Sequence, residues 1–146
     1  MTTDSSWPAP GPAAPARVLL VEDNADHQRL IELLLARLGV SVIKANNGQE
    51  GFEIILAGEA VALILMDLHM PRFDGYEAAL QIRQWESKNA QARHTIIALT
   101  ADAHEDVHPR CLAVGMDDVL GKPVSLERLK ALLARWLPAA PPGPPS

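Results

Sequence analysis

The chain of 146 residues is poor in several features that mark common classes of protein. Cys111 is its single cysteine, which excludes an internal disulfide and a cysteine-based zinc site. No apolar run approaches the roughly 18 residues of a membrane span, and the N-terminus lacks the apolar segment of a secretion signal. Its basic residues are scattered and its formal charge is -5, which argues against a nucleic-acid or membrane-surface partner. These absences favour a soluble, cytoplasmic protein.

Proline is scarce in the middle of the chain and concentrated at its ends. Four of the twelve prolines lie within residues 1–16 and five within residues 138–146. Both ends are predicted to be extended or disordered, and Trp7 is interpreted as an exposed aromatic residue there. The expected organisation is therefore a head of residues 1–16, one domain of residues 17–137, and a proline-rich tail of residues 138–146.

Between the ends, short apolar segments typical of strands alternate with amphipathic segments typical of helices. The predicted strands are 17–24, 40–45, 61–67, 94–102 and 117–123. The predicted helices are 26–39, 48–58, 75–87, 103–115 and 125–137. In the first helix, the leucines at helical spacing are Leu30, Leu33, Leu34 and Leu38. Five such units predict an α/β fold, a doubly wound parallel sheet of five strands with helices on both faces.

The polar residues that follow the predicted strands form a candidate site, because ligands of such sheets bind outside the carboxyl ends of the strands. The first strand ends at Glu22 and Asp23, and the third ends at Asp67. Thr100 ends the fourth strand and Lys122 follows the fifth. Three carboxylates repel one another, and Mg²⁺, which prefers oxygen ligands, removes that conflict. A metal, an ammonium and a hydroxyl suit the stabilisation of a transferring phosphoryl group.

The chain contains neither G-x-x-x-x-G-K-S/T nor G-x-G-x-x-G, so the phosphoryl group is not expected to sit on bound ATP. An aspartate can itself accept a phosphoryl group as a nucleophile. Asp67 is the candidate, because it ends the most apolar strand and has no neighbouring acid in the sequence.

Four segments give the chain a recognisable resemblance. They are "VLLVEDN", "LILMDLHMPRFDGYE", "IIALTAD" and "GMDDVLGKPV", in this order. Residues 17–137 resemble the receiver domain of two-component signalling, most of all the receivers of hybrid histidine kinases and phosphorelays. The resemblance implies a flavodoxin-like (βα)5 fold and a phosphoacceptor signalling domain rather than an enzyme.

The resemblance also implies a role for each residue of the candidate site. It makes Asp67 the phosphoacceptor, Thr100 the hydroxyl that moves toward the phosphoryl oxygen, and Lys122 its charge partner. The implied ligands of Mg²⁺ are Glu22, Asp23, Asp67 and the backbone carbonyl of His69. A cis bond is expected between Lys122 and Pro123. We further hypothesise that His69 and Asp102 control attack by water on the phosphorylated aspartate.

The implied donor is a phosphohistidine on a histidine kinase or a histidine phosphotransfer protein. A downstream protein is expected to read the surface formed by the fourth helix, fifth strand and fifth helix. Val119 stands where many receivers carry an aromatic switch residue, so the conformational readout is expected to depend on Thr100. Because only the proline-rich tail follows residue 137, the chain is expected to act as a stand-alone switch or phosphorelay intermediate without an output domain.

Two other classes of function stay open at this point. A pseudo-receiver would keep the fold as an interaction module without phosphorylation, and Val119 is the one feature that favours it. A Mg²⁺-dependent phosphatase with an aspartyl nucleophile usually has a second acid two residues after the nucleophile, where this chain has His69.

The remaining polar and aromatic residues suggest structural roles. Asp117 and Asp118 are predicted to form a solvated turn, and Cys111 to be a small buried apolar residue. Trp85 and Trp136 are predicted to pack at helix ends. The histidines predicted to be exposed are His27, His94, His104 and His108; a metal site at His104 and His108 is the less favoured interpretation.

Overall fold

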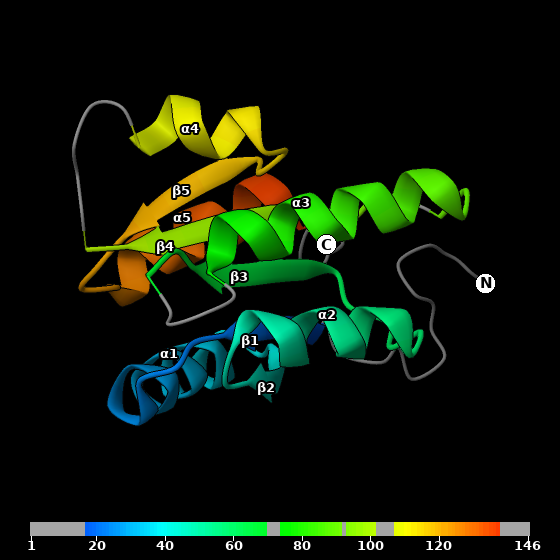
Figure 1. The fold of residues 1–146 in the computed structure, drawn as a ribbon. Coiled ribbons are helices and arrows are strands. Elements are labelled where there is room, and N and C mark those ends of the chain that lie inside the picture. Colours follow the sequence, from blue (N-terminus) through cyan, green and yellow to red (C-terminus); the bar gives the residue numbers. More distant parts are fainter. Residues whose placement is uncertain (1–16, 70–73, 92, 102–106, 138–146) are drawn as a thin grey trace.

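The computed structural model describes residues 17–69, 74–91, 93–101 and 107–137 (Figure 1). The strands are β1 (Arg17–Val21), β2 (Ser41–Ala45), β3 (Leu63–Asp67), β4 (Ile96–Thr100) and β5 (Asp118–Gly121). The helices are α1 (Ala25–Arg37), α2 (Gly48–Leu56), α3 (Gly75–Lys88), α4 (Val107–Ala113) and α5 (Leu126–Trp136). The predicted alternation of strands and helices is therefore confirmed. The predicted head and tail, with Trp7, lie outside the described residues.

All strand pairs are parallel, and the strand order is β2-β1-β3-β4-β5. Helices α2, α3 and α4 cover one face of the sheet, and α1 and α5 cover the other (Figure 1). Strand β3 is central and wholly buried, because both of its faces are covered. The chain moves from β1 to β2 on one side and then to β3 on the other, so the order of strands reverses between β1 and β3. This reversal marks where a ligand site is expected.

Local signals in the sequence set the helix ends. Asp74 caps α3, and the side chain of Glu77 accepts a hydrogen bond from the Asp74 backbone in return. Ser125 caps α5 as predicted. Gly39, which follows α1, has φ of 78°, a conformation that an L side chain rarely adopts. These caps fix the points at which the chain enters and leaves the sheet layer.

The buried face of α1 differs from the one suggested by its leucine spacing. Ile31 and Leu35 are buried against the sheet, whereas Leu30 and Leu33 are 43% and 49% exposed. Several residues of an apolar-rich helix satisfy a 3.6-residue period at once, and the direction in which the helix starts decides which of them faces the sheet. Here that start is the Asn24 cap, whose side chain accepts a hydrogen bond from the α1 backbone.

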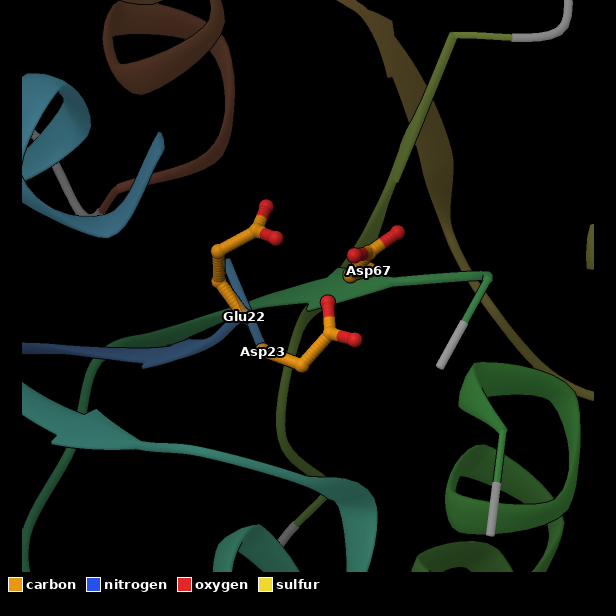
Figure 2. A group of neighbouring side chains, drawn as sticks. All are labelled: Glu22, Asp23 and Asp67. Carbon is orange, nitrogen blue, oxygen red and sulfur yellow. The ribbon is translucent and has the colours of Figure 1, made fainter. Parts of the chain in front are cut away.

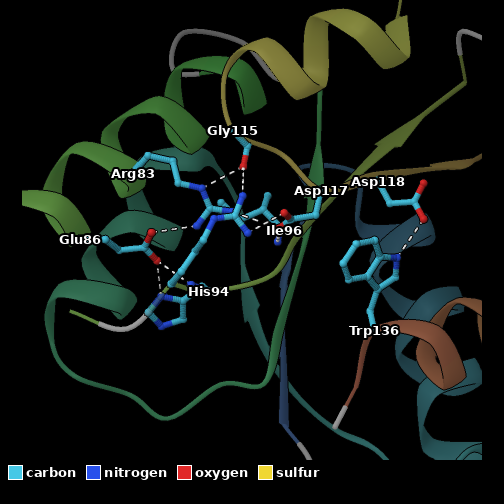
Figure 3. A network of polar contacts seen from close by, with 9 residues as sticks. Arg83, Glu86, His94, Ile96, Gly115, Asp117, Asp118 and Trp136 are labelled. Carbon is cyan, nitrogen blue, oxygen red and sulfur yellow. Dashed lines mark hydrogen bonds and ion pairs between the residues drawn. The ribbon is translucent and has the colours of Figure 1, made fainter. Parts of the chain in front are cut away.

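The prediction that Asp117 and Asp118 form a solvated turn is wrong. Asp117 has a side chain that is only 10% exposed, and it accepts hydrogen bonds from Arg83 at 3.1 Å and from the N–H of Ile96 at 2.9 Å (Figure 3). Asp118 belongs to β5 and accepts a hydrogen bond from the Trp136 indole at 2.8 Å. Both carboxylates are partners of distant side chains, which hold the start of β5 in place.

The prediction that His94 is exposed is also wrong. His94 is half-buried, and its Nδ1 lies 2.6 Å from Oε2 of the buried Glu86 (Figure 3). Burial raises the pKa of Glu86, but hydrogen bonds from His94 and Arg83 outweigh it, so the net effect lowers that pKa. We call Arg83, Glu86, Arg93, His94 and Asp117 the distal polar network, because it lies at the amino end of β4, opposite the strand ends that carry the candidate site.

The other structural predictions hold where the structure describes them. Cys111 is fully buried, and burial raises the pKa of its thiol. Trp85 and Trp136 pack against the two core layers, and Trp136 has the additional polar contact with Asp118. His27 and His108 are exposed, and His104 lies outside the described residues. None of the helices in the described ranges combines the length and apolar composition needed to cross a bilayer.

Candidate functional site

The candidate site lies at the carboxyl ends of β1, β3 and β4 and just beyond β5. Glu22 follows β1 directly, and its N–H donates to Ala45 O at 3.0 Å, which continues the parallel ladder for one more residue. Asp67 is the last residue of β3. The N–H of Lys122 donates to Thr100 O at 2.8 Å, so the lysine extends β5 beside the end of β4. The rigid sheet thus brings together residues that are far apart in the sequence.

Glu22, Asp23 and Asp67 form a carboxylate cluster at this place (Figure 2). Each offers one oxygen, and these oxygens lie within 4.8 Å of one another. Glu22 and Asp67 are buried, whereas Asp23 is exposed. Two buried carboxylates and a third beside them concentrate negative charge, which needs compensation by a cation.

Lys122 supplies one positive charge to the cluster. Its Nζ lies 2.7 Å from Glu22 Oε1 and 3.4 Å from Asp67 Oδ2. The same ammonium lies 3.5 Å from Nδ1 of His27, at the start of α1. The peptide bond between Lys122 and Pro123 is cis, as the resemblance implied.

Asp67 lies in a polar but mostly enclosed environment. Burial raises the pKa of Asp67, and the Glu22 carboxylate adds to this increase. The N–H of His69, which donates to Asp67 Oδ1 at 3.0 Å, opposes it, as does the Lys122 ammonium. The net direction is upward, so the charged form of Asp67 is held at a cost to folding.

Gly75, at the start of α3, contacts the backbone of the same aspartate. A Cβ at this position would lie 2.3 Å from the carbonyl oxygen of Asp67 and 3.0 Å from Leu68 Cα. Only a residue without a side chain permits this approach. The pair Asp74–Gly75 therefore lets the N-terminus of α3 pack against the backbone of Asp67, the candidate acceptor.

Thr100 and His69 face each other beside Asp67. Thr100 is buried at the end of β4, and its Oγ1 lies 3.5 Å from Nε2 of His69. His69 is an exposed residue, so the buried threonine hydroxyl contacts a side chain that reaches solvent. His69 therefore touches the site twice, through its N–H on Asp67 and through its ring on Thr100.

Sequence reasoning did not assign the residues that hold Glu22. The N–H of Asn24 donates to Glu22 Oε2 at 3.1 Å. The Gln28 amide donates to Glu22 O at 3.0 Å and approaches Ala45 O at 3.4 Å. The Asn24 contact uses a backbone N–H and left no signal in the sequence, whereas Gln28 lies one helical turn after the Asn24 cap, a spacing that returns its side chain to the strand end.

The donor set fits a divalent cation. Among the described residues, Glu22 Oε1 is a buried oxygen without a hydrogen bond of good geometry, although the Lys122 ammonium lies 2.7 Å away. The cluster carries three carboxylates against one ammonium, and all of its ligand atoms are hard oxygens. Oxygen ligands with room for water are what Mg²⁺ prefers.

The structure brings five of the predicted site residues together. Glu22, Asp23, Asp67 and Lys122 lie close to one another, and Thr100 joins them by its contact with the His69 ring. The part assigned to the His69 carbonyl stays a prediction, and Asp102 lies outside the described residues. Val119, in β5, is partly buried against the core under α2, α3 and α4.

A family model described as the response regulator receiver domain matches residues 18–134. The chain belongs to the response regulator receiver domain family. Receiver domains are phosphoacceptor signalling modules rather than enzymes that act on an external substrate, which agrees with a strand-end aspartate beside a lysine.

Several much longer proteins contain a region similar to this receiver. The sensor protein GacS of Pseudomonas syringae pv. syringae is 38% identical over 120 residues, which are 82% of this chain and 13% of that protein. Hybrid signal transduction histidine kinase A of Dictyostelium discoideum is 34% identical over 125 residues, 86% of this chain and 6% of that protein. The chain thus spans a small part of these relatives, and the similar relatives include hybrid histidine kinases.

Two examples of solved structures that resemble the chain are both receiver domains. One is the receiver domain of the Saccharomyces cerevisiae response regulator Ssk1 in a co-crystal with the histidine phosphotransfer protein Ypd1; it has a TM-score of 0.77 and 36% identity, covering 84% of this chain and 88% of that chain. The other is the receiver domain of the sensor histidine kinase PA1611 from Pseudomonas aeruginosa PAO1, with a magnesium ion coordinated in its active site cleft. It has a TM-score of 0.72 and 38% identity, covering 84% of this chain and 98% of that chain.

Proposed function

We propose that this receiver accepts a phosphoryl group from a phosphohistidine onto Asp67, as a step in a phosphorelay. The observation that carries the proposal is the carboxylate cluster beside the Lys122 ammonium, with Asp67 at the end of the central strand. The Ssk1 receiver, which is similar to this chain, crystallised with a histidine phosphotransfer protein. A protein of that kind, or a histidine kinase, is the proposed donor, and the cytoplasm the proposed location.

The carboxylates of Glu22, Asp23 and Asp67, with the carbonyl of His69, are the proposed holders of Mg²⁺. When bound, Mg²⁺ supplies positive charge that offsets the negative charge of the phosphoryl oxygens and of the carboxylates. The PA1611 receiver, which is similar to this chain, holds magnesium in its active site cleft.

In the transfer step, a carboxylate oxygen of Asp67 attacks the phosphorus of the donor phosphohistidine. A P–O bond forms and the P–N bond breaks, and the donor nitrogen keeps the electron pair. Lys122, whose Nζ is 3.4 Å from Asp67 Oδ2, stabilises the charge on the transferred oxygens. Loss of the carboxylate charge and gain of the phosphoryl charge then changes the balance of attraction around Lys122 and Thr100.

The readout of phosphorylation is proposed to depend on Thr100 and on the surface of α4, β5 and α5, where a downstream protein would bind. Val119 replaces the aromatic residue that many receivers use, so the movement of the Thr100 hydroxyl away from His69 is the proposed first event. The stand-alone arrangement without an output domain stays a prediction.

The function is tested by incubating the purified chain with acetyl phosphate, and separately with a panel of radiolabelled histidine phosphotransfer proteins. We expect a stoichiometric acyl phosphate that hydroxylamine releases and that does not form when a chelator removes Mg²⁺. Multiple turnover of a phosphate ester would instead indicate the phosphatase, and an absence of labelling with every donor would indicate a pseudo-receiver.

His69→Ala is expected to shorten the lifetime of the phosphorylated aspartate about three- to tenfold, the equivalent of one lost contact of ~1 kcal/mol. The ring contacts the buried Thr100 hydroxyl and belongs to an exposed residue, so its removal is expected to give water easier access to the site. Time-resolved dephosphorylation after removal of the donor measures this lifetime. Asp102→Ala tests the other half of the hypothesis, and unchanged rates in both variants would contradict it.

A further inference from the structure

Lys122 has a third neighbour that belongs to neither the carboxylate cluster nor the strand ends. His27 Nδ1 lies 3.5 Å from Lys122 Nζ with hydrogen-bond geometry, provided that the ring carries its proton on Nε2. An ammonium has three N–H donors, and three groups of the described residues lie within 3.5 Å of this one: the carboxylates of Glu22 and Asp67, as ion pairs, and the imidazole of His27, with hydrogen-bond geometry. Of these three groups, the imidazole alone is uncharged when it accepts a hydrogen bond, whereas the two carboxylates are negatively charged.

This difference in charge matters when a divalent cation occupies the cluster. A cation held there would offset the charge of the Glu22 and Asp67 carboxylates, so their attraction for the ammonium would fall, and its own charge would repel the ammonium. His27 is not among the residues that would hold the metal. Its acceptor nitrogen therefore remains available to Lys122 in the state in which the phosphoryl group arrives.

The space around the ammonium gives the imidazole a second effect. A cavity of about 100 Å³ lies beside Lys122 and is lined by His27, Leu30, Ile31, Lys122, Pro123 and Val124. Removing the His27 ring enlarges this cavity and gives the lysine side chain room to move away from Asp67. The ring thus restricts the lysine both by its acceptor nitrogen and by its volume.

We propose that His27 is a positioning residue that holds the Lys122 ammonium against Asp67 for phosphoryl transfer. The proposal rests on the proposed function of Asp67 and adds a residue that acts on it only through the lysine. The first turn of α1 would therefore have a role in the site, which the sequence alone does not indicate.

The contact is tested without any phosphorylation by NMR of the histidine ring nitrogens. We expect neutral His27 to be in the Nε2–H tautomer, and Lys122→Met, which keeps an unbranched side chain and removes its donors, to shift His27 toward a tautomer mixture. An unchanged ring signal in Lys122→Met overturns the proposal, whether or not Asp67 can be phosphorylated.

The role in transfer is tested by a double-mutant cycle on the rate of phosphorylation by acetyl phosphate with Mg²⁺. His27→Ala is expected to slow the reaction about three- to tenfold, and His27→Asn, whose Oδ1 replaces Nδ1, to restore most of it. In a Lys122→Met background, His27→Ala is expected to have no further effect, because its partner is absent. Arg29→Ala, an exposed change on the same helix away from the cavity, is the control.

The possible results separate the two proposals. If His27→Ala slows phosphorylation equally in the wild-type and the Lys122→Met backgrounds, the positioning role is overturned. It is also overturned if His27→Ala is phosphorylated at the wild-type rate. If no variant, wild type included, becomes phosphorylated, the proposed function fails and the role in transfer fails with it, whereas the NMR measurement still decides whether His27 holds Lys122.

Discussion

Asp67→Asn is expected to abolish labelling by phosphohistidine and by acetyl phosphate, a loss of at least about a thousandfold in rate, because an amide is not a nucleophile here. The same substitution is expected to raise the melting temperature of the metal-free protein. Asp67 is buried beside Glu22, and removing its charge removes a repulsion within the cluster. Phosphorylation assays and thermal unfolding with a chelator measure the two effects on one preparation.

The pH dependence of this stabilisation follows from the direction of the pKa shift. Burial, aided by Glu22, raises the folded-state pKa of Asp67 above its unfolded value. The stability linked to this carboxyl is therefore fully present below the unfolded pKa and is lost as the pH rises through the folded one. The advantage of Asp67→Asn over wild type should accordingly grow as the pH rises from the acidic range toward neutrality.

Asp26→Asn is the matched control, because it makes the same change at an exposed acid in the first turn of α1. It should leave both labelling and the pH profile close to wild type. A stable, Mg²⁺-dependent acyl phosphate on Asp67→Asn would exclude Asp67 as the acceptor. If Asp67→Asn is less stable than wild type in the absence of metal, the repulsion between Asp67 and Glu22 does not lower the stability of the fold.

The cluster was predictable because it depends only on which segments are strands and on their being parallel. Once "LILMD" is a buried strand, Asp67 must lie at its carboxyl end, and the same rule places Glu22 after β1. The reversal between β1 and β3 then makes these two acids neighbours. No knowledge of side-chain contacts was needed for this step.

The partners of single side chains were not predictable in the same way. Asp117 looks like half of a polar turn until the fold brings Arg83, 34 residues earlier, against it. His27 looks like an exposed helix residue until Lys122, 95 residues later, arrives beside its ring. Such contacts depend on the packing of complete elements, so neither composition nor local periodicity contains them.

The distal polar network shows what such a contact contributes. Arg83 uses three nitrogens: Nε donates to Gly115 O at 2.8 Å, Nη1 to Glu86 at 2.8 Å and Nη2 to Asp117 at 3.1 Å (Figure 3). The Arg83 side chain is only 15% exposed, so these acceptors replace the hydrogen bonds that its guanidinium would make with water. It joins α3 to the segment that leads from α4 into β5.

Asp117→Ala is expected to destabilise the fold by about 3 kcal/mol, the lower end of the cost of breaking a buried ion pair by removing one partner. The variant leaves the Arg83 guanidinium short of one anion and the N–H of Ile96 without its side-chain acceptor. Urea unfolding followed by the fluorescence of Trp85 and Trp136 measures the change. The phosphorylation of Asp67 should persist wherever the variant is folded, because the network lies at the opposite end of the sheet.

Arg93→Ala separates the buried part of the network from its exposed part. Arg93 Nη1 lies 2.6 Å from Asp117 Oδ1, a shorter contact than that of Arg83, but its side chain is 57% exposed. Water can replace an exposed partner, so this variant should lose no more than about 1 kcal/mol. Equal losses of stability in Asp117→Ala and Arg93→Ala would contradict this expectation. They would show that the burial of Arg83 does not make its ion pair stronger than that of the exposed Arg93. The expected ordering makes burial the quantity that decides how firmly α3 holds β5.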